Sequence, residues 1–177
     1  MVGHKDIIQY IQNAVTEDKV SHAYILNGER GAGKKLLAAL FAETLLCEEK
    51  GPEPCGKCHS CIQAESGNHP DIIRVTHEKP GSIAVDDIRE QVNQTVAVKP
   101  YQGAYKVYII PEADLMTVQA QNALLKTIEE PPEYVVILLL TENADQLLPT
   151  INSRCVMLKL RNIKDKLIKR YLMEKLE

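Results

Sequence analysis

The sequence predicts an α/β protein in which a parallel sheet of five strands lies between two layers of helices. Short apolar runs alternate with longer segments of helical periodicity, the order in which crossover helices join parallel strands. One run, VVILLL at 135–140, is apolar at every position, as expected for a central strand covered on both faces. With 177 residues, of which 45% are hydrophobic and 25% charged, the chain is long enough to bury such a core.

The first part of the chain predicts a helix, a strand, a glycine-rich loop and a second helix. Residues 4–18 carry isoleucines and a valine at helical spacing, and residues 24–26 form a short apolar run. Glycines follow directly at 28–33. Beyond them, one apolar face runs to about Cys47 and is formed by Leu36, Leu37, Leu40, Phe41, Leu45 and Leu46.

The remaining elements continue the alternation after an insertion at about 47–70 that is rich in Gly, Pro, Cys and His. Acidic side chains are favoured in the first turn of a helix, so Asp86 and Asp87 predict the start of a helix that runs to about Val96. Pro131 and Pro132 end a long helix predicted to begin at Ala113. Three further strands are predicted at 71–75, 106–110 and 156–160, and an amphipathic helix at 164–176.

Composition excludes several classes of protein. A net charge of −3 argues against a protein that coats nucleic acid by itself. No apolar run reaches the roughly 20 residues of a membrane span, and the acidic and polar residues of MVGHKDIIQY exclude a secretory signal. We therefore expect a cytoplasmic protein with no membrane partner, whose five cysteines serve some purpose other than disulfides.

The glycine-rich segment has the form of a phosphate-binding loop, Gly28-x4-Gly33-Lys34, between a strand and a helix. Gly28, Gly31 and Gly33 permit the close approach of backbone N–H groups to a phosphate, and Lys34 would reach its terminal groups. The next position normally carries Ser or Thr, whose hydroxyl ligates magnesium. Here it is Lys35, and an ammonium group has no lone pair to offer a cation.

The acidic segment after the 106–110 strand also departs from the pattern of a magnesium-dependent nucleotide hydrolase. Nucleotide hydrolases hold magnesium and activate water with acids at such a strand end. Here Pro111 stands where the metal-binding aspartate is expected, Glu112 occupies the water-activating position, and Asp114 follows. Nucleotide binding therefore stays open, ATP and magnesium are expected to bind weakly or not at all, and hydrolysis is expected to be crippled.

The insertion predicts a structural zinc site. Four thiolates can surround a tetrahedral zinc with no open position, and a segment this poor in apolar residues needs such a staple. The candidate ligands are Cys47, Cys55, Cys58 and Cys61. Iron–sulfur or free thiols stay open, although the fourth cysteine of a ferredoxin run is missing. His59 is expected to face solvent, and Cys155 to lie in the core.

Arg154 lies just ahead of the last predicted strand. An arginine there could point at a phosphate held by a neighbouring subunit, where such a group stabilises transition-state charge. A surface ion pair is the alternative, and from the residue alone it is the favoured one.

These pieces together resemble the AAA+ clamp-loader subunits of bacterial DNA polymerase III. The matching segments are SHAYILNGERGAGKK, the four cysteines, HPDIIRV (69–75), NALLKTIEEPP (122–132) and LLPTINSRC (147–155), so the resemblance extends to about Leu160. It implies an AAA+ P-loop domain at 1–160 with a zinc-binding insertion, and the first helix of a truncated helical lid at 161–177. It also implies that Arg154 acts on ATP in an adjacent gamma/tau subunit, and that Thr141 or Asn143 senses phosphate.

Within that group the catalytic gamma/tau subunits carry Gly-Lys-Thr and an intact acidic pair, from which this chain departs at Lys35 and Pro111. In this respect it is similar to the delta-prime type. The resemblance then implies a non-hydrolysing subunit of the DNA-directed DNA polymerase holoenzyme, with gamma/tau and delta subunits as partners. The loader places a sliding clamp on primed DNA.

Two other functions stay open. One is an active gamma/tau-type ATPase in which Glu112 or Asp114 replaces the missing aspartate. The other is a zinc-bearing DNA-binding module that uses the basic residues Lys164, Lys166, Lys169 and Arg170.

Overall fold

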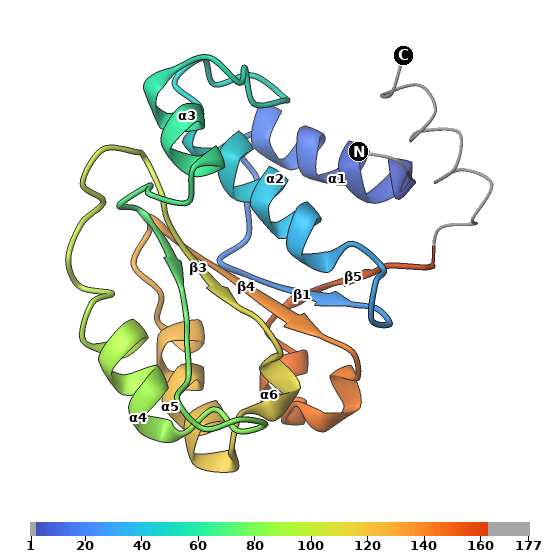
Figure 1. Ribbon diagram of the computed structural model, residues 1–177, viewed down its shortest axis with the longest axis vertical. Coiled ribbons are helices and arrows are strands. Elements are labelled where there is room, and N and C mark those ends of the chain that lie inside the picture. The colour runs from blue at the N-terminus through green and yellow to red at the C-terminus, as the bar shows by residue number, and fades with distance from the viewer. Residues whose placement is uncertain (1–2, 163–177) are drawn as a thin grey trace.

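The computed structural model describes residues 3–162 and contains one parallel sheet of five strands in the order β2-β3-β4-β1-β5. Figure 1 shows the sheet running through the middle of the molecule. The predicted parallel sheet is confirmed, and its strands are β1 (Ala23–Asn27), β2 (Ile72–Arg74), β3 (Lys106–Ile110), β4 (Val135–Thr141) and β5 (Val156–Lys159).

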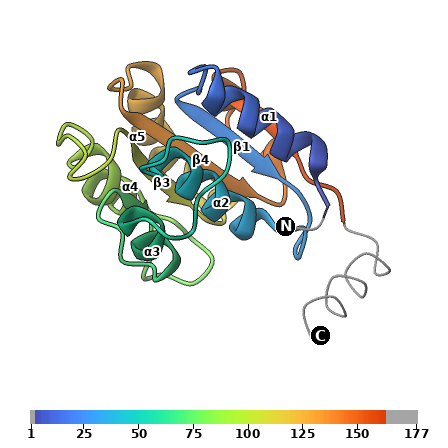
Figure 2. The same ribbon diagram turned by 90° about the horizontal axis from the view of Figure 1, so that it is seen from above.

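Helices cover both faces of this sheet, which gives the predicted three layers. In Figure 1, α1 (Lys5–Thr16) and α2 (Lys34–Leu46) lie above the strands, and α4 (Val85–Ile88) and α5 (Val118–Glu129) lie below them. Figure 2 shows α1 and α2 side by side across the upper face. None of the helices in residues 3–162 is long and apolar enough to cross a bilayer.

The central strand β4 contributes side chains to two hydrophobic cores, one on each face of the sheet. Its alternate residues Val135, Ile137 and Leu139 pack with α4 and α5, and Val136, Leu138 and Leu140 pack with α1 and α2. All seven residues of the strand are buried. This explains why the run is apolar without alternation, since each face of the sheet meets a helical layer.

The helix predicted from Ala113 begins later, and that part of the prediction is wrong. Residues Ala113–Leu115 form a 3₁₀ turn and Met116 is extended. The cause is a bridge to Ile83, whose N–H donates to the Leu115 carbonyl at 2.9 Å and whose carbonyl accepts the Thr117 N–H at 3.0 Å. Thr117 then caps α5 by accepting the Ala120 N–H at 3.1 Å.

Several shorter elements also differ from the expectation. The helix predicted over 86–96 is α4 followed by a π-helical turn, Arg89–Asn93. The insertion contains an unpredicted helix, α3 (His59–Glu65), and α6 (Pro149–Asn152) lies between β4 and β5. The helix predicted at 164–176, and with it most of the proposed lid segment, lies outside the described residues.

Candidate functional site

The glycine loop and the acidic segment line one pocket at the carboxyl edge of the sheet. The loop follows β1, and the Gly28 N–H donates to the carbonyl of Thr141 at the end of β4, at 3.1 Å. The pocket has a volume of about 590 Å³. Its lining includes Arg30, Gly31, Gly33, Lys34, Lys35, Leu36, Pro111, Glu112, Asp114, Leu140, Thr141 and Glu142. Residues predicted separately from two segments are therefore brought together.

The loop has the backbone that its glycines permit. Gly31 and Gly33 have φ angles of 84° and 90°, in the left-handed region that other residues rarely adopt. Gly28 is required for a different reason, because a Cβ there would lie 2.9 Å from the Cβ of Leu160. The loop is thus shaped by its own sequence and by the chain that follows β5.

The two loop lysines behave differently. The Lys34 ammonium donates to the Glu29 carbonyl at 2.9 Å and also to the Gly28 carbonyl, so it folds back on its own loop. Lys35 is exposed in the first turn of α2 and reaches the same pocket. The position where a hydroxyl would ligate magnesium therefore carries an ammonium group.

Of the three acidic side chains that line the pocket, Asp114 is hydrogen-bonded to another side chain and Glu112 lies near a histidine. The Thr141 hydroxyl donates to the Asp114 carboxylate at 2.9 Å and accepts the Asn143 N–H at 3.1 Å. Glu112 has φ 55°, its side chain is 63% exposed, and its carboxylate lies 3.7 Å from His77 Nε2. Pro111 lines the pocket without contributing any oxygen ligand from its side chain.

The structure distinguishes the two candidate phosphate sensors by position. Thr141 is buried and lines the pocket, whereas Asn143 is exposed and its side chain accepts the Asp145 N–H at 3.0 Å, as a cap of the next turn. Sequence reasoning missed His77. A signal existed, because residues that follow neighbouring strands meet at one edge, and β2 is the neighbour of β3.

Arg154 lies at the opposite edge of the sheet. It precedes β5, so it sits where the parallel strands begin, whereas the glycine loop follows the end of β1. Its guanidinium is 3.3 Å from the Glu129 carboxylate at the end of α5, and its side chain is 50% exposed. Arg154 therefore cannot serve the pocket of its own chain, and it is accessible to another molecule.

The four cysteines of the insertion form one cluster, in which the sulfur atoms of Cys47, Cys55, Cys58 and Cys61 all lie within 4.8 Å of one another. A tetrahedral zinc with Zn–S bonds of about 2.3 Å would need separations of roughly 3.8 Å, so small side-chain adjustments close the site. Three backbone N–H groups already point at sulfur, at 3.3–3.4 Å. The cluster could hold a metal ion, and its all-sulfur donor set fits one.

The pKa values of the cysteine thiols differ because their surroundings differ. Backbone N–H groups of Lys57 and Cys58 lower the pKa of Cys55 to about 7, whereas burial raises the pKa of Cys61 to about 12. The separate thiol, Cys155, is half-buried against the lower core, and burial raises its pKa to about 12. His59 is exposed, as expected.

A buried hydrogen-bond chain ties the cluster to the sheet. The Ser60 hydroxyl donates to the Leu46 carbonyl at 2.7 Å and accepts from His69 Nε2 at 2.9 Å. His69 Nδ1 in turn accepts the Asp71 N–H at 3.1 Å. These roles require a neutral imidazole with its proton on Nε2. Burial lowers the pKa of His69, opposed in part by Asp71.

Asp71 extends this chain to the segment before β3. Its buried carboxylate accepts backbone N–H groups from Tyr101 at 2.5 Å and from Gln102 and Gly103 at 2.8 Å each. Gly103 has no room for a side chain, because a Cβ there would lie 2.5 Å from Leu46. No residue spacing predicts these contacts, because they join residues about 30 positions apart.

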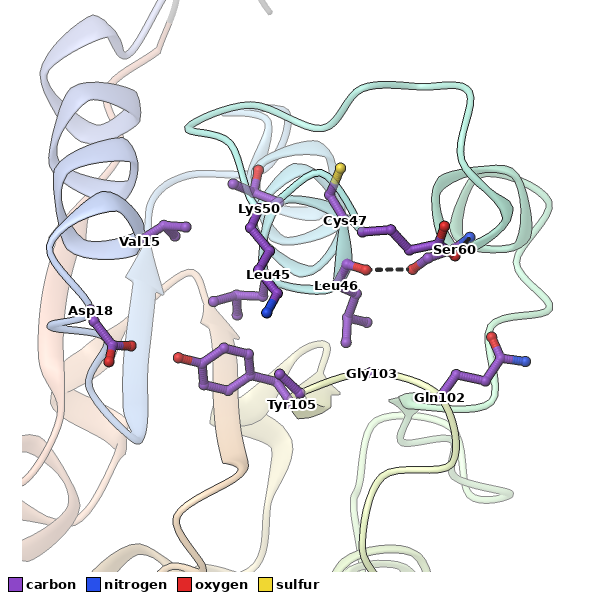
Figure 3. Close-up of a pocket in the computed structure, with 13 residues that line it drawn as sticks. Val15, Asp18, Leu45, Leu46, Cys47, Lys50, Ser60, Gln102, Gly103 and Tyr105 are labelled. Carbon is purple, nitrogen blue, oxygen red and sulfur yellow. Dashed lines mark hydrogen bonds between the residues drawn. The ribbon is translucent and has the colours of Figure 1, made fainter.

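A second pocket of about 540 Å³ lies at this junction. Figure 3 shows it between Val15 and Asp18 at the end of α1, Leu46 at the end of α2, and Gly103 and Tyr105 before β3. The dashed contact in that view is the hydrogen bond between Ser60 and Leu46. The insertion thus rests on the amino edge of the sheet, away from the glycine loop.

Comparison with known proteins agrees with this arrangement. The family model described as "DNA polymerase III, delta subunit" matches residues 3–164. The chain is 39% identical over 173 residues to DNA polymerase III subunit tau/gamma of Haemophilus influenzae, covering 97% of this chain and 25% of that protein. It is 38% identical over 169 residues to subunit delta' of Bacillus subtilis, covering 95% and 50%. The chain thus spans half or less of the length of these relatives.

Solved structures agree on the fold. A gamma subunit-related protein of Thermotoga maritima matches with a TM-score of 0.66 and 25% identity, over 95% of this chain and 49% of that one. The branch-migration motor RuvB of the same organism matches with a TM-score of 0.58 at 17% identity, over 98% and 52%. Both likenesses give the AAA+ fold, and the family match over residues 3–164 shows that this chain belongs to the DNA polymerase III delta subunit family.

Proposed function

We propose that this chain is a delta-prime-type subunit of the bacterial clamp loader, which does not hydrolyse ATP itself. It acts in the cytoplasm with gamma/tau and delta subunits, as part of the machinery that places a sliding clamp on primed DNA. Residues 1–160 are the AAA+ domain, and 161–177 begin the lid. The cysteine cluster holds one structural zinc, the metal that prefers a closed tetrahedron of four thiolates.

The observation that carries this proposal is the side-chain chemistry of the glycine-loop pocket. Lys35 and Pro111 line it where a metal-binding hydroxyl and carboxylate would be needed. The Asp114 carboxylate is bonded to Thr141 at 2.9 Å, and Glu112 faces His77 at 3.7 Å. Hydrolysis of ATP requires a magnesium ion and a positioned water, and this lining favours neither.

The position of Arg154 supports a role toward another subunit. It stands at the sheet edge opposite the pocket of its own chain, half-exposed and paired only with the partly exposed Glu129 among residues 3–162. Exposed ion pairs of this kind contribute about 0–1 kcal/mol. The guanidinium can therefore leave Glu129 at little cost to contact a phosphate on a neighbouring subunit.

The test replaces Arg154 with alanine in the full-length subunit and measures DNA-stimulated ATPase of the reconstituted loader. An arginine supplied in trans raises the rate of hydrolysis about 10³-fold or more at its site. Without it, ATP hydrolysis at that site should nearly stop, and the total turnover of the loader should drop. Arg89→Ala is the matched control, since Arg89 is also exposed and paired with an acid, Asp86, at 3.8 Å. Unchanged turnover with Arg154→Ala would remove this role.

An active gamma/tau-type ATPase is the second candidate. It is favoured by the 39% identity to a tau/gamma subunit and by the two carboxylates, Glu112 and Asp114, that line the pocket. In that case Asp114 would release Thr141 and take over magnesium binding. Magnesium-dependent ATP turnover by the purified subunit alone distinguishes the two candidates.

A further inference from the structure

The pocket of about 540 Å³ at the amino edge of the sheet carries a carboxylate on each of two sides. Figure 3 shows Asp18, at the end of α1, on one side of the pocket and Ser60, in α3, on the other. The Glu48 carboxylate accepts the Ser60 N–H at 3.3 Å, so it lies on the side of α3. The two negative charges are therefore separated by the pocket itself.

An apolar wall lies between the two acids. It is formed by Val15 of α1, by Leu45 and Leu46 at the end of α2, and by the ring of Tyr105. Burial, and next the charge of Asp18, raise the pKa of Tyr105, which indicates that the phenol lies close to that carboxylate. A wall of this kind suits methylene groups, and the volume has room for a chain of several carbons.

The charge balance of the pocket favours a further cation. Two negative side chains, Asp18 and Glu48, and one positive side chain, Lys50, line it. Among residues 3–162, none of the three has an ion-pair partner. In addition, α2 ends at the pocket with no basic residue in its last turn, and the carbonyl end of a helix attracts cations.

Lys50 shows what kind of cation the pocket accommodates. Its side chain points into the pocket toward Tyr105 (Figure 3), and it is an alkyl chain that ends in an ammonium group. It compensates one of the two acids and leaves the other uncompensated. Because Lys50 is exposed and unpaired among residues 3–162, it can move aside for a ligand of the same chemistry.

The walls of the pocket are held in place before any ligand arrives. Asp71 accepts the N–H groups of Gln102 and Gly103 at 2.8 Å each, which fixes the segment before β3. The Ser60 hydroxyl donates to the Leu46 carbonyl at 2.7 Å, which fixes α3 against the end of α2. A ligand therefore does not have to order the site, and little of its binding energy is lost in doing so.

We propose that this pocket binds an aliphatic polyamine, with one ammonium group at Asp18, a second at Glu48, and the methylene chain along Leu45 and Leu46. The ammonium groups donate charge-assisted hydrogen bonds to the two carboxylates, and the ring of Tyr105 adds a cation–π contact. Lys50 competes with the ligand as a like charge. The site is independent of the proposed ATPase role, because it lies at the sheet edge opposite the glycine loop.

The experiment measures binding to the full-length, metal-loaded subunit by calorimetry at pH 7.5. Salt of about 0.15 M screens diffuse attraction between exposed charges. The ligands are spermidine, the diamine cadaverine and the monoamine n-butylamine. We expect saturable binding of one spermidine and of one cadaverine per chain, and weaker binding of butylamine, because a single ammonium group can reach only one of the two acids.

Two variants should change the affinity in opposite directions. Asp18→Asn should weaken spermidine binding about fivefold, the effect of one partly exposed ion pair. Lys50→Met should strengthen it by about the same factor, because the competing charge is removed. Asp18 and Lys50 have φ angles of 54° and 51°. Asparagine tolerates this conformation as aspartate does, and methionine is no more strained there than lysine, so both variants should fold.

Asp145→Asn is the matched control, since Asp145 is an exposed aspartate outside the lining of this pocket. It loses the same charge and should bind spermidine as the wild type does. Equal weakening by Asp18→Asn and Asp145→Asn would overturn the inference, because it would indicate diffuse attraction to an acidic surface.

Three other results would also overturn it: no saturable binding of spermidine or cadaverine, weaker binding by Lys50→Met, or butylamine that binds as tightly as the diamine. The last result would indicate a pocket for a single ammonium group, such as a lysine side chain of a partner protein. None of these outcomes affects the proposed function, whose tests measure ATP turnover.

Discussion

The cysteine cluster and the glycine-loop pocket are two candidate ligand sites of one chain, and they differ in the arrangement of their side chains. The four sulfurs lie together within 4.8 Å, receive backbone N–H groups and are tied to the sheet through Ser60 and His69. The pocket has the backbone of a phosphate-binding loop, but its Asp114 carboxylate is hydrogen-bonded to Thr141 and its Glu112 carboxylate lies 3.7 Å from His77. If the pocket is inactive as proposed, a folded scaffold has kept the shape of a site without the side chains that perform its chemistry.

The difference has a physical origin. The insertion is poor in apolar residues, so under the proposed zinc role its fold depends on the metal, and losing a ligand would lose structure. The glycine loop is held by backbone bonds and by packing of Gly28 on Leu160, which need no ligand. Substitutions such as Lys35 or Pro111 change the chemistry there without a large cost to folding.

Metal removal should break the first site and produce the largest effect. At metal levels about 1,000-fold above Kd, binding stabilises a protein by about 4 kcal/mol, and 1 kcal/mol corresponds to about 2–4 °C in Tm at this size. We therefore expect a strong chelator, or Cys58→Ser, to lower Tm by about 8–16 °C in calorimetry.

Elemental analysis should give one zinc per chain for the wild type and for Cys155→Ser, the control thiol outside the cluster. A Tm that does not respond to the chelator would contradict the structural role of the cluster. A brown protein absorbing near 400 nm would replace zinc with an iron–sulfur centre.

A smaller loss of stability should follow from the protonation of His69, whose hydrogen bonds join the cysteine cluster to the sheet. Burial lowers its pKa in the folded state, so as pH falls the unfolded chain takes up a proton before the folded one. Stability from this group is therefore intact above the unfolded pKa of about 6.5 and decreases as pH falls below it. Denaturant unfolding at pH 7.5 and 5.5 should show this loss.

His69→Asn keeps an acceptor for the Asp71 N–H but cannot titrate. It should cost about 1–3 kcal/mol at pH 7.5, because Ser60 loses its donor in a buried position. Its further loss between pH 7.5 and 5.5 should be smaller than that of the wild type, since the other histidines are unchanged. An equal pH dependence in both proteins would show that His69 does not contribute it.

Most of the fold could be predicted from the sequence because local patterns encode it. Each of the five strands lies within one residue of its predicted bounds, since apolar runs between turn residues are strong signals. The helix start at Val118 could not be predicted, because the bridge between Ile83 and Met116 joins positions far apart in the chain. The helix α3 was not predicted because it lacks a clear apolar face. Its start is instead marked by Cys58, whose Sγ accepts the Cys61 N–H as an N-cap.

The site was predictable to a similar degree. Motif spacing located the cysteines, the loop lysines and the acids, and the structure brings each set together. Spacing could not show that Asp114 is bonded to Thr141, that Glu112 faces His77, or that His69 contacts Ser60. Those partners depend on strand order and on side-chain geometry, which a single sequence does not specify.

The most direct test of the account is ATP turnover by the purified full-length subunit, free of other loader subunits, with magnesium and primed DNA present. The pocket chemistry at Lys35 and Pro111 predicts no turnover above background, while the reconstituted loader containing the same preparation hydrolyses ATP. Sustained magnesium-dependent turnover by the subunit alone, abolished by Lys34→Ala, would contradict it.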